Sequence, residues 1–196
     1  ALVKGSIPDE LVNKPLPALI VRQDGEAWKR PFVSVFCPYT STEGSSVKSV
    51  AYFGDRPDFT GIMVESDRRT DYIFNSTDAR EAVTYKDMQF QGDYAIIGEN
   101  GNEPALFFLG NGTLLKKDGW SIAARDSTAN VAINKEGENW MADVSSAVNV
   151  TIPPNIHLSV TDMTDITRRI DLNTQPDGTC MVILTKGRYL LKETNR

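Results

Sequence analysis

The densest cluster of residues that could do chemistry is the run Trp28-Lys29-Arg30-Pro31-Phe32. An exposed Trp ring stacks on the apolar face of a sugar, and a planar guanidinium pairs with a carboxylate or a sulfate. Trp28 and Arg30, with Tyr39 further along the same stretch, are therefore the candidate glycan-contact residues. The alternative is that Trp28 packs at a sheet edge and Arg30 pairs with a local carboxylate.

Groups suited to catalysis or metal binding are scarce. His157 is the one histidine, and the two cysteines, Cys37 and Cys180, show no metal-ligand spacing. No nucleophile motif such as GxSxG accompanies His157. We therefore assign no catalytic residue, no metal site and no cofactor to this chain. Cys37 and Cys180 are expected not to be bonded to each other, because they fall in different sheet units and a disulfide needs neighbouring Cα atoms.

The charge balance excludes further classes of function. Lys and Arg number 21 against 26 Asp and Glu, which gives a net charge of -5. Such a chain is a poor candidate for nucleic-acid binding, because affinity for phosphate backbones comes from clustered Lys and Arg. No apolar run is long enough for a membrane span. The first residues contain neither an initiator Met nor a signal sequence, so we expect a fragment of a longer protein.

Hydrophobic residues recur with a period of two along most of the chain, which predicts strands rather than helices. Turn chemistry separates the runs, as at Gly110-Asn111-Gly112 and Lys117-Asp118-Gly119. We take Gln91-Gly92-Asp93 as another turn. Short strands at close, regular spacing predict an all-β chain, an antiparallel β-sandwich followed by a small second β unit.

A polar, Gly-containing stretch at Lys135-Glu136-Gly137-Glu138-Asn139 is the best candidate for a boundary. We therefore expect a leader arm at residues 1–14, a β-sandwich at 15–135 and a small all-β tail at 136–196. The tail is too short to be stable alone, so it is expected to pack on the first sheet.

Six stretches in this order resemble a known family: residues 20–23, 28–36, 38–39, 47–50, 90–97 and 106–115. Residues 17–124 resemble the C-terminal β-sandwich of heparinase II/III-like polysaccharide lyases. That resemblance implies an upstream helical toroid and cleavage of acidic polysaccharides by β-elimination, using a Tyr, a His and an Asn or Arg that neutralises the uronate. The sequence departs from the family at Cys37, where Glu is common, and it has no His before His157. No catalytic residue is therefore carried over.

The expected function is that of a non-catalytic β-sandwich region in a periplasmic or extracellular acidic-polysaccharide lyase. It would support an upstream helical catalytic domain of the same chain and line one side of the glycan cleft. Two alternatives stay open. A stand-alone carbohydrate-binding module would show an exposed aromatic platform, whereas a structural or adhesion module would bury Trp28, Trp120 and Trp140.

Overall fold

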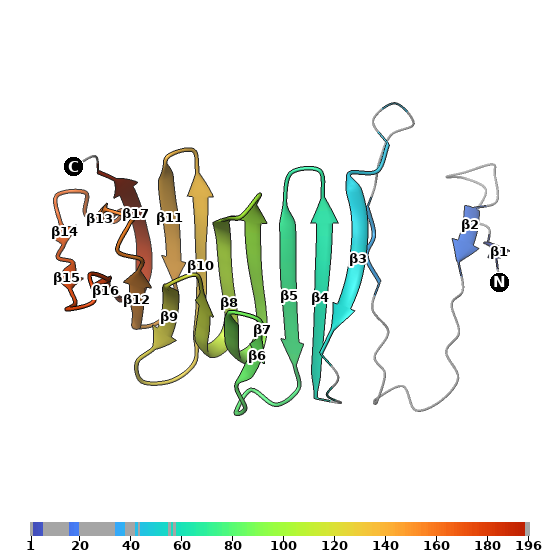
Figure 1. Cartoon of the computed structure of the whole chain (residues 1–196), viewed down its shortest axis with the longest axis horizontal. Coiled ribbons are helices and arrows are strands. Elements are labelled where there is room, and N and C mark those ends of the chain that lie inside the picture. Colours follow the sequence, from blue (N-terminus) through green and yellow to red (C-terminus); the bar gives the residue numbers. More distant parts are fainter. Residues whose placement is uncertain are drawn as a thin grey trace. The chain divides into compact units, whose positions relative to one another are not determined.

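The computed structural model describes residues 2–5, 16–19, 34–37, 42, 44–54, 56 and 58–194 of the 196-residue chain. They fall into two compact units, Ala1–Val33 and Ser34–Arg196. In the first unit, β1 (Leu2–Gly5) pairs antiparallel with β2 (Leu16–Leu19). Part of the segment expected to be a leader arm is thus a paired strand. The second unit holds β3 to β17 and, in its described residues, no helix (Figure 1).

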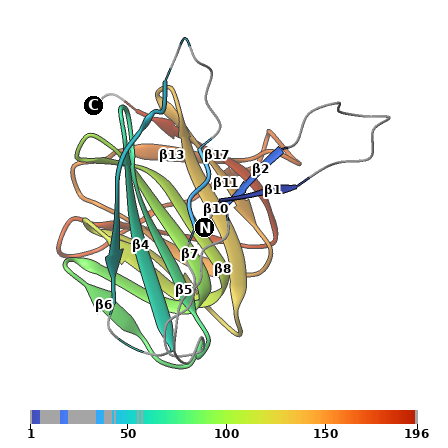
Figure 2. The same cartoon turned by 90° about the vertical axis from the view of Figure 1, so that its right-hand side faces the viewer.

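Strands of the second unit form one continuous antiparallel path, in the order β14-β13-β17-β11-β10-β8-β7-β5-β4-β3. Their bounds are β3 (Val47–Phe53), β4 (Phe59–Ser66), β5 (Thr70–Ser76), β7 (Met88–Asn100), β8 (Glu103–Lys117), β10 (Ala129–Glu136), β11 (Asn139–Val144), β13 (Leu158–Asp162), β14 (Arg169–Ile170) and β17 (Gly187–Glu193). Seen from the side in Figure 2, the strand direction turns steadily across this sheet, which is the usual twist. The expected all-β, antiparallel class is confirmed.

Along one edge, strand β8 pairs with two different strands, and the second of these begins a second layer of strands. Its first part pairs with β10, and residues 114–117 pair with β9 (Trp120–Ala124). From β9 the layer continues through β12 (Val148–Ile152) and β16 (Cys180–Leu184) to β15 (Asn173–Thr174). The short β6 (Val83–Tyr85) pairs with the start of β7. Between these two parts of β8, at residues 112–114, its pairing register with β7 shifts. The two strands come unusually close there, since a Cβ on Gly92 would lie 2.6 Å from the Cα of Gly112.

The two layers share one apolar core. Trp120 of β9 packs against Trp140 of β11 with ring centroids 4.9 Å apart, and against Phe107 of β8 at 5.6 Å. The same cluster extends to Phe53 and Phe74 at the other end of the sheet. Burial of these alternating side chains is the main favourable term that holds the antiparallel strands together.

The boundary expected between residues 135 and 136 coincides with the hairpin turn between β10 and β11, inside the Ser34–Arg196 unit. Ile133 before the turn and Trp140 after it belong to the same core. Gly137 makes the turn with φ of 64°. A tight turn and a linker have the same polar, Gly-containing composition, so composition does not separate them.

No disulfide joins Cys37 and Cys180, as expected. Both side chains are half-buried rather than fully buried, and the Cys180 Sγ lies 3.7 Å from the Thr174 Oγ1. None of the described segments is a helix of the length and apolarity that crossing a bilayer requires.

Candidate functional site

The residues singled out from the sequence, Trp28, Arg30 and Tyr39, lie outside the described residues. Their role as glycan contacts therefore stays a prediction. The described segment nearest to them, Ser34–Cys37, has no regular secondary structure, and Phe36 within it is 88% exposed.

A buried lysine is the most unusual ionisable group of the second unit. Lys117 ends β8, and its Nζ lies 2.9 Å from Glu99 Oε1, 3.0 Å from Asp87 Oδ2 and 3.1 Å from Asp118 Oδ2. The Nζ also lies 5.8 Å from the centroid of the Tyr72 ring. Glu99 is the second-last residue of β7, and Asp87 and Asp118 lie in adjoining turns. In the strand ladders Glu99 pairs with Pro104 and Lys117 with Trp120, so the ion pair between Glu99 and Lys117 is not a contact between ladder partners.

The charges in this cluster support stability, not proton transfer. Burial alone would lower the pKa of Lys117, but hydrogen bonds to Glu99, Asp87 and Asp118 raise it above its ordinary value. Burial, reinforced by the charge of Glu99, raises the pKa of Tyr72. A tyrosine that removes a proton near neutral pH needs a lowered pKa instead. The cluster therefore holds Lys117 in its charged form, and its tyrosine is not prepared to act as a base.

The two described tryptophans cannot act as a sugar platform. Trp120 is 2% exposed and Trp140 is 1% exposed, so neither ring offers a face to a ligand. Both residues line a cavity of about 420 Å³ between the β7–β8 turn and the β12–β13 connection. Above them, the Lys135 Nζ lies 5.6 Å from the Trp140 ring centroid and 3.7 Å from Glu193 Oε1. This cation covers the indole and completes the packing.

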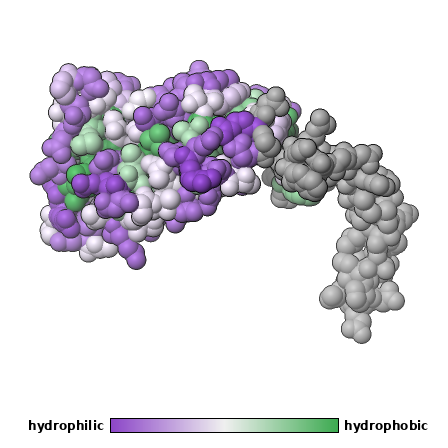
Figure 3. Space-filling view, turned by 90° about the horizontal axis from the view of Figure 1, so that it is seen from below, coloured by the Kyte–Doolittle hydropathy of each residue, from purple (hydrophilic) through white to green (hydrophobic). Residues whose placement is uncertain are grey.

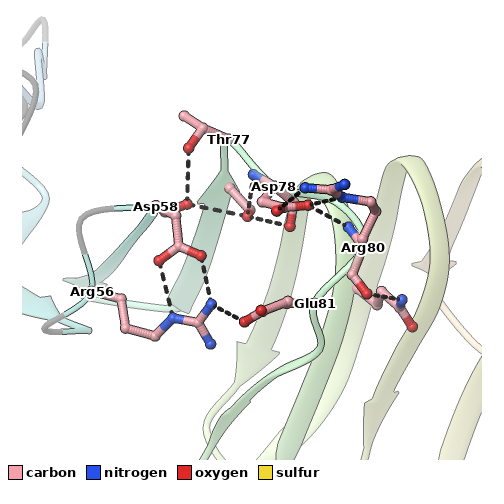
Figure 4. A network of polar contacts seen from close by, with 8 residues as sticks. Arg56, Asp58, Thr77, Asp78, Arg80 and Glu81 are labelled. Atoms are coloured by element: carbon pink, nitrogen blue, oxygen red, sulfur yellow. Dashed lines mark hydrogen bonds and ion pairs between the residues drawn. The ribbon is translucent and has the colours of Figure 1, made fainter.

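A second polar network ties the β5–β6 connection to the start of β4 (Figure 4). Arg56 bridges Asp58 and Glu81, with its Nε 3.0 Å from Asp58 Oδ1 and its Nη2 2.6 Å from Glu81 Oε2. Next to them, Arg80 holds Asp78 through both carboxylate oxygens. The Arg80 side chain, followed by the Arg80 backbone N–H, lowers the pKa of Asp78 to about 2. All five charged side chains are already paired within the chain, so this network fastens a loop.

The sheet face that points away from the core is unusually apolar. Neighbouring strands align one unbroken row on it, in the order Tyr52, Ile62, Ile73, Ile96, Phe108, Ala132 and Asp143. We call this surface of β3, β4, β5, β7, β8, β10 and β11 the outer face. In an antiparallel sheet the face away from the core is normally polar. Figure 3 looks toward the strand ends rather than onto this face, and that end of the molecule is mostly hydrophilic with smaller hydrophobic patches. An apolar sheet face marks a place of contact.

One arginine is fixed on this outer face. Gly98 of β7 lies beside Asp71 of β5, and a Cβ on Gly98 would lie 2.7 Å from the Arg69 Nε. The guanidinium therefore occupies the space that a side chain on β7 would fill. The Arg69 Nε donates a hydrogen bond to Asp71 Oδ1 at 2.6 Å, which fixes the orientation of the fork.

A groove of about 430 Å³ opens on the same outer face beside Phe108. Its walls come from β8, β10, β11 and the turn before β17. Polar groups at its rim include Asn130, Ser145, Asp143 and Lys186. The sequence patterns did not indicate this site, since the residues are distant in the chain and no motif links them. Within the described part of the chain, no group of His, Cys, Asp and Glu is arranged to hold a metal ion.

Comparison with known proteins places most of this outer face inside one family match. Residues 47–134 match the family model described as the C-terminal domain of endo-acting ulvan lyase. The match begins with β3 and ends in β10. Among curated proteins, the chain is similar to an endo-acting ulvan lyase of Formosa agariphila, with 33% identity over 125 residues. That alignment covers 59% of this chain and 15% of the relative, so the chain spans a small part of the relative's length.

Proposed function

We propose that this chain is a non-catalytic, C-terminal β domain of an acidic-polysaccharide lyase that acts on ulvan or a related uronate-containing glycan. The observation that carries the proposal is the match of residues 47–134 to the C-terminal domain of endo-acting ulvan lyases. The Formosa agariphila relative is itself an endo-acting ulvan lyase, and it is several times longer than the region it shares with this chain.

Placing the chemistry outside this chain follows from what elimination requires. A base must reach the proton next to the uronate carboxyl, an acid must reach the leaving oxygen, and a cation must neutralise the carboxylate. In the described residues, Tyr72 is a poorer base than a free tyrosine and Lys117 is enclosed by carboxylates. We therefore assign the reaction to an upstream domain of the same protein. A helical toroid of the heparinase II/III type is our proposal for it, as is a periplasmic or extracellular location.

The role proposed for this domain is to support the catalytic domain and to contribute one wall of the glycan cleft. The apolar outer face supports a contact of this kind, and so does the edge strand β3, in which residues 48–52 are exposed on both faces and Val50 and Tyr52 are 48% and 57% exposed. A purely structural or adhesion module, one of the alternatives, agrees with the burial of Trp120 and Trp140. The outer-face groove with its polar rim favours glycan contact over that alternative.

The assay is the ultraviolet absorbance of the unsaturated uronate that elimination creates. The isolated chain, incubated with ulvan, alginate or chondroitin, is expected to produce no absorbance increase. A protein that carries the upstream region is the positive control. Turnover by the isolated chain would overturn the non-catalytic assignment and would make His157, its one histidine, the first residue to substitute.

A further inference from the structure

We propose that the outer-face groove beside Phe108 binds one anionic sugar residue of an acidic polysaccharide, with the Lys186 ammonium pairing with its carboxylate or sulfate. This inference rests on the proposed function and deepens it, because it locates the glycan contact within the domain. The groove lies wholly within the Ser34–Arg196 unit.

A β-bulge shapes the groove. The register between β8 and β10 shifts between Ala129 and Val131: two residues of β8, Gly110 and Asn111, lie opposite the single residue Asn130, so the extra residue of the bulge is on β8. Such bulges re-aim side chains and occur beside binding sites. Asn130 and Ser145 hold each other through backbone bonds: the Asn130 N–H donates to Ser145 Oγ at 2.8 Å, and the Ser145 N–H donates to the Asn130 carbonyl at 2.9 Å. Two polar side chains are thus fixed at one end of the groove.

The fixed side chains keep their donors available. Asn130 Oδ1 accepts a hydrogen bond from the Asn111 N–H at 2.8 Å, which sets the orientation of the amide, and Asn130 lines the groove. The Ser145 oxygen is used as an acceptor, so its O–H can donate. Within the described part of the chain, neither the Asn130 NH₂ nor the Ser145 O–H donates elsewhere. Preoriented donors of this kind recognise sugar hydroxyls and carboxylates at low entropic cost.

Of the described residues that line the groove, the one charged side chain without an ion-pair partner is a cation. Among the described residues, Lys186 takes part in no ion pair, although it lines the groove. The one acidic side chain at the rim, Asp143, faces Arg188, whose Nε lies 3.5 Å from Asp143 Oδ1. An unpaired ammonium beside a neutralised carboxylate favours an anion, even in a chain with a net charge of -5.

An aromatic wall supplies the apolar contact. The Phe108 ring lines the groove, and the Tyr94 ring lies edge-on to it with centroids 5.9 Å apart. Aromatic faces and edges of this kind pack on the C–H surface of a sugar ring. The fixed Arg69 fork lies over Gly98, a diagonal neighbour of Phe108 at roughly 7–8 Å between Cα atoms.

The test is binding of defined glycans to the 196-residue chain by isothermal titration calorimetry. The probes are ulvan oligosaccharides, alginate oligosaccharides (carboxylate only), chondroitin with and without sulfate, and neutral dextran. We expect acidic glycans to bind, dextran not to bind, and affinity to fall as salt is raised. Lys186→Gln and Asn130→Asp are each expected to weaken binding about ten-fold, the loss of one charge-assisted hydrogen bond. Asn130→Asp keeps the Oδ1 acceptor and so leaves the bulge intact.

Lys116→Gln is the matched control, because Lys116 is an exposed lysine of β8 near the opposite end of that strand from the Phe108 groove. Its removal changes the net charge equally and is expected to leave affinity within two-fold (about 0.4 kcal/mol). If Lys116→Gln and Lys186→Gln weaken glycan binding equally, the attraction is nonspecific and the proposal that the groove binds the glycan is wrong. Absence of any acidic-glycan binding would also overturn it. Neither result affects the lyase assay above, so the two proposals fail separately.

Discussion

Lys117 is the residue whose charge the fold is expected to need most. Removing it leaves Glu99 nearly buried without its cation, whereas Asp87 and Asp118 are partly exposed and screened. We expect Lys117→Met to lower the free energy of unfolding by about 2–3 kcal/mol. Urea denaturation measures this, with Lys116→Met as the exposed neighbour for comparison. An equally small loss in both variants would mean that the ion cluster does not stabilise the domain.

Asp78 gives a pH-dependent prediction. Its folded-state pKa of about 2 lies below the unfolded value near 3.9, because Arg80 holds the carboxylate. The stability that it contributes is therefore present above pH ~4 and is lost as the pH falls from about 4 to 2. Asp78→Asn should unfold more easily at pH 7 and match the parent chain near pH 2 in thermal melts. A difference that persists at pH 2 would contradict this explanation. Asp126→Asn, at an exposed site, is the control.

At the scale of elements, the close approach of β7 and β8 is the feature most sensitive to substitution. A methyl group on Gly92 meets backbone, the Cα of Gly112, at 2.6 Å, so no side-chain rotation can relieve the overlap. We expect Gly92→Ala to cost about 2–3 kcal/mol of unfolding free energy. Gly137→Ala meets nothing within 4 Å and carries only the strain of its positive φ, roughly 1 kcal/mol. Chemical denaturation measures the unfolding free energy of both variants. If both lose the same amount, the close approach of β7 and β8 is not the cause of the loss in Gly92→Ala.

The strands were largely predictable from the alternation of apolar residues, but their ends were not. The motifs Gln91-Gly92-Asp93 and Gly110-Asn111-Gly112 have the composition of turns, yet β7 and β8 run through both. Their glycines permit a bulge and a close strand crossing, which use the same residues as a hairpin turn. The sequence analysis also did not single out β10, although Ala129, Val131 and Ile133 alternate there with Asn130, Ala132 and Asn134.

For the whole molecule, the order of strands in the sheet determines which distant residues form the groove, and the sequence patterns did not predict that order. Lys186, Ser145, Asn130 and Phe108 meet only because β8, β10, β11 and β17 lie side by side. No local pattern encodes that order. The scarcity of catalytic groups and the likeness to a polysaccharide lyase were visible in the sequence, because both depend on residue types and their order along the chain. The predicted contacts Trp28, Arg30 and Tyr39 lie outside the described residues and stay predictions.

The central claim is that this domain serves an acidic-polysaccharide lyase without performing the reaction. The most direct measurement is the initial rate of unsaturated-uronate formation from ulvan by the full-length gene product and by the same protein ending before Ser34. We expect the full-length protein to be active, and the shortened protein to keep the reaction with a KM raised about ten-fold or with a lower melting temperature. A full-length protein that forms no unsaturated uronate from any acidic polysaccharide would contradict the account.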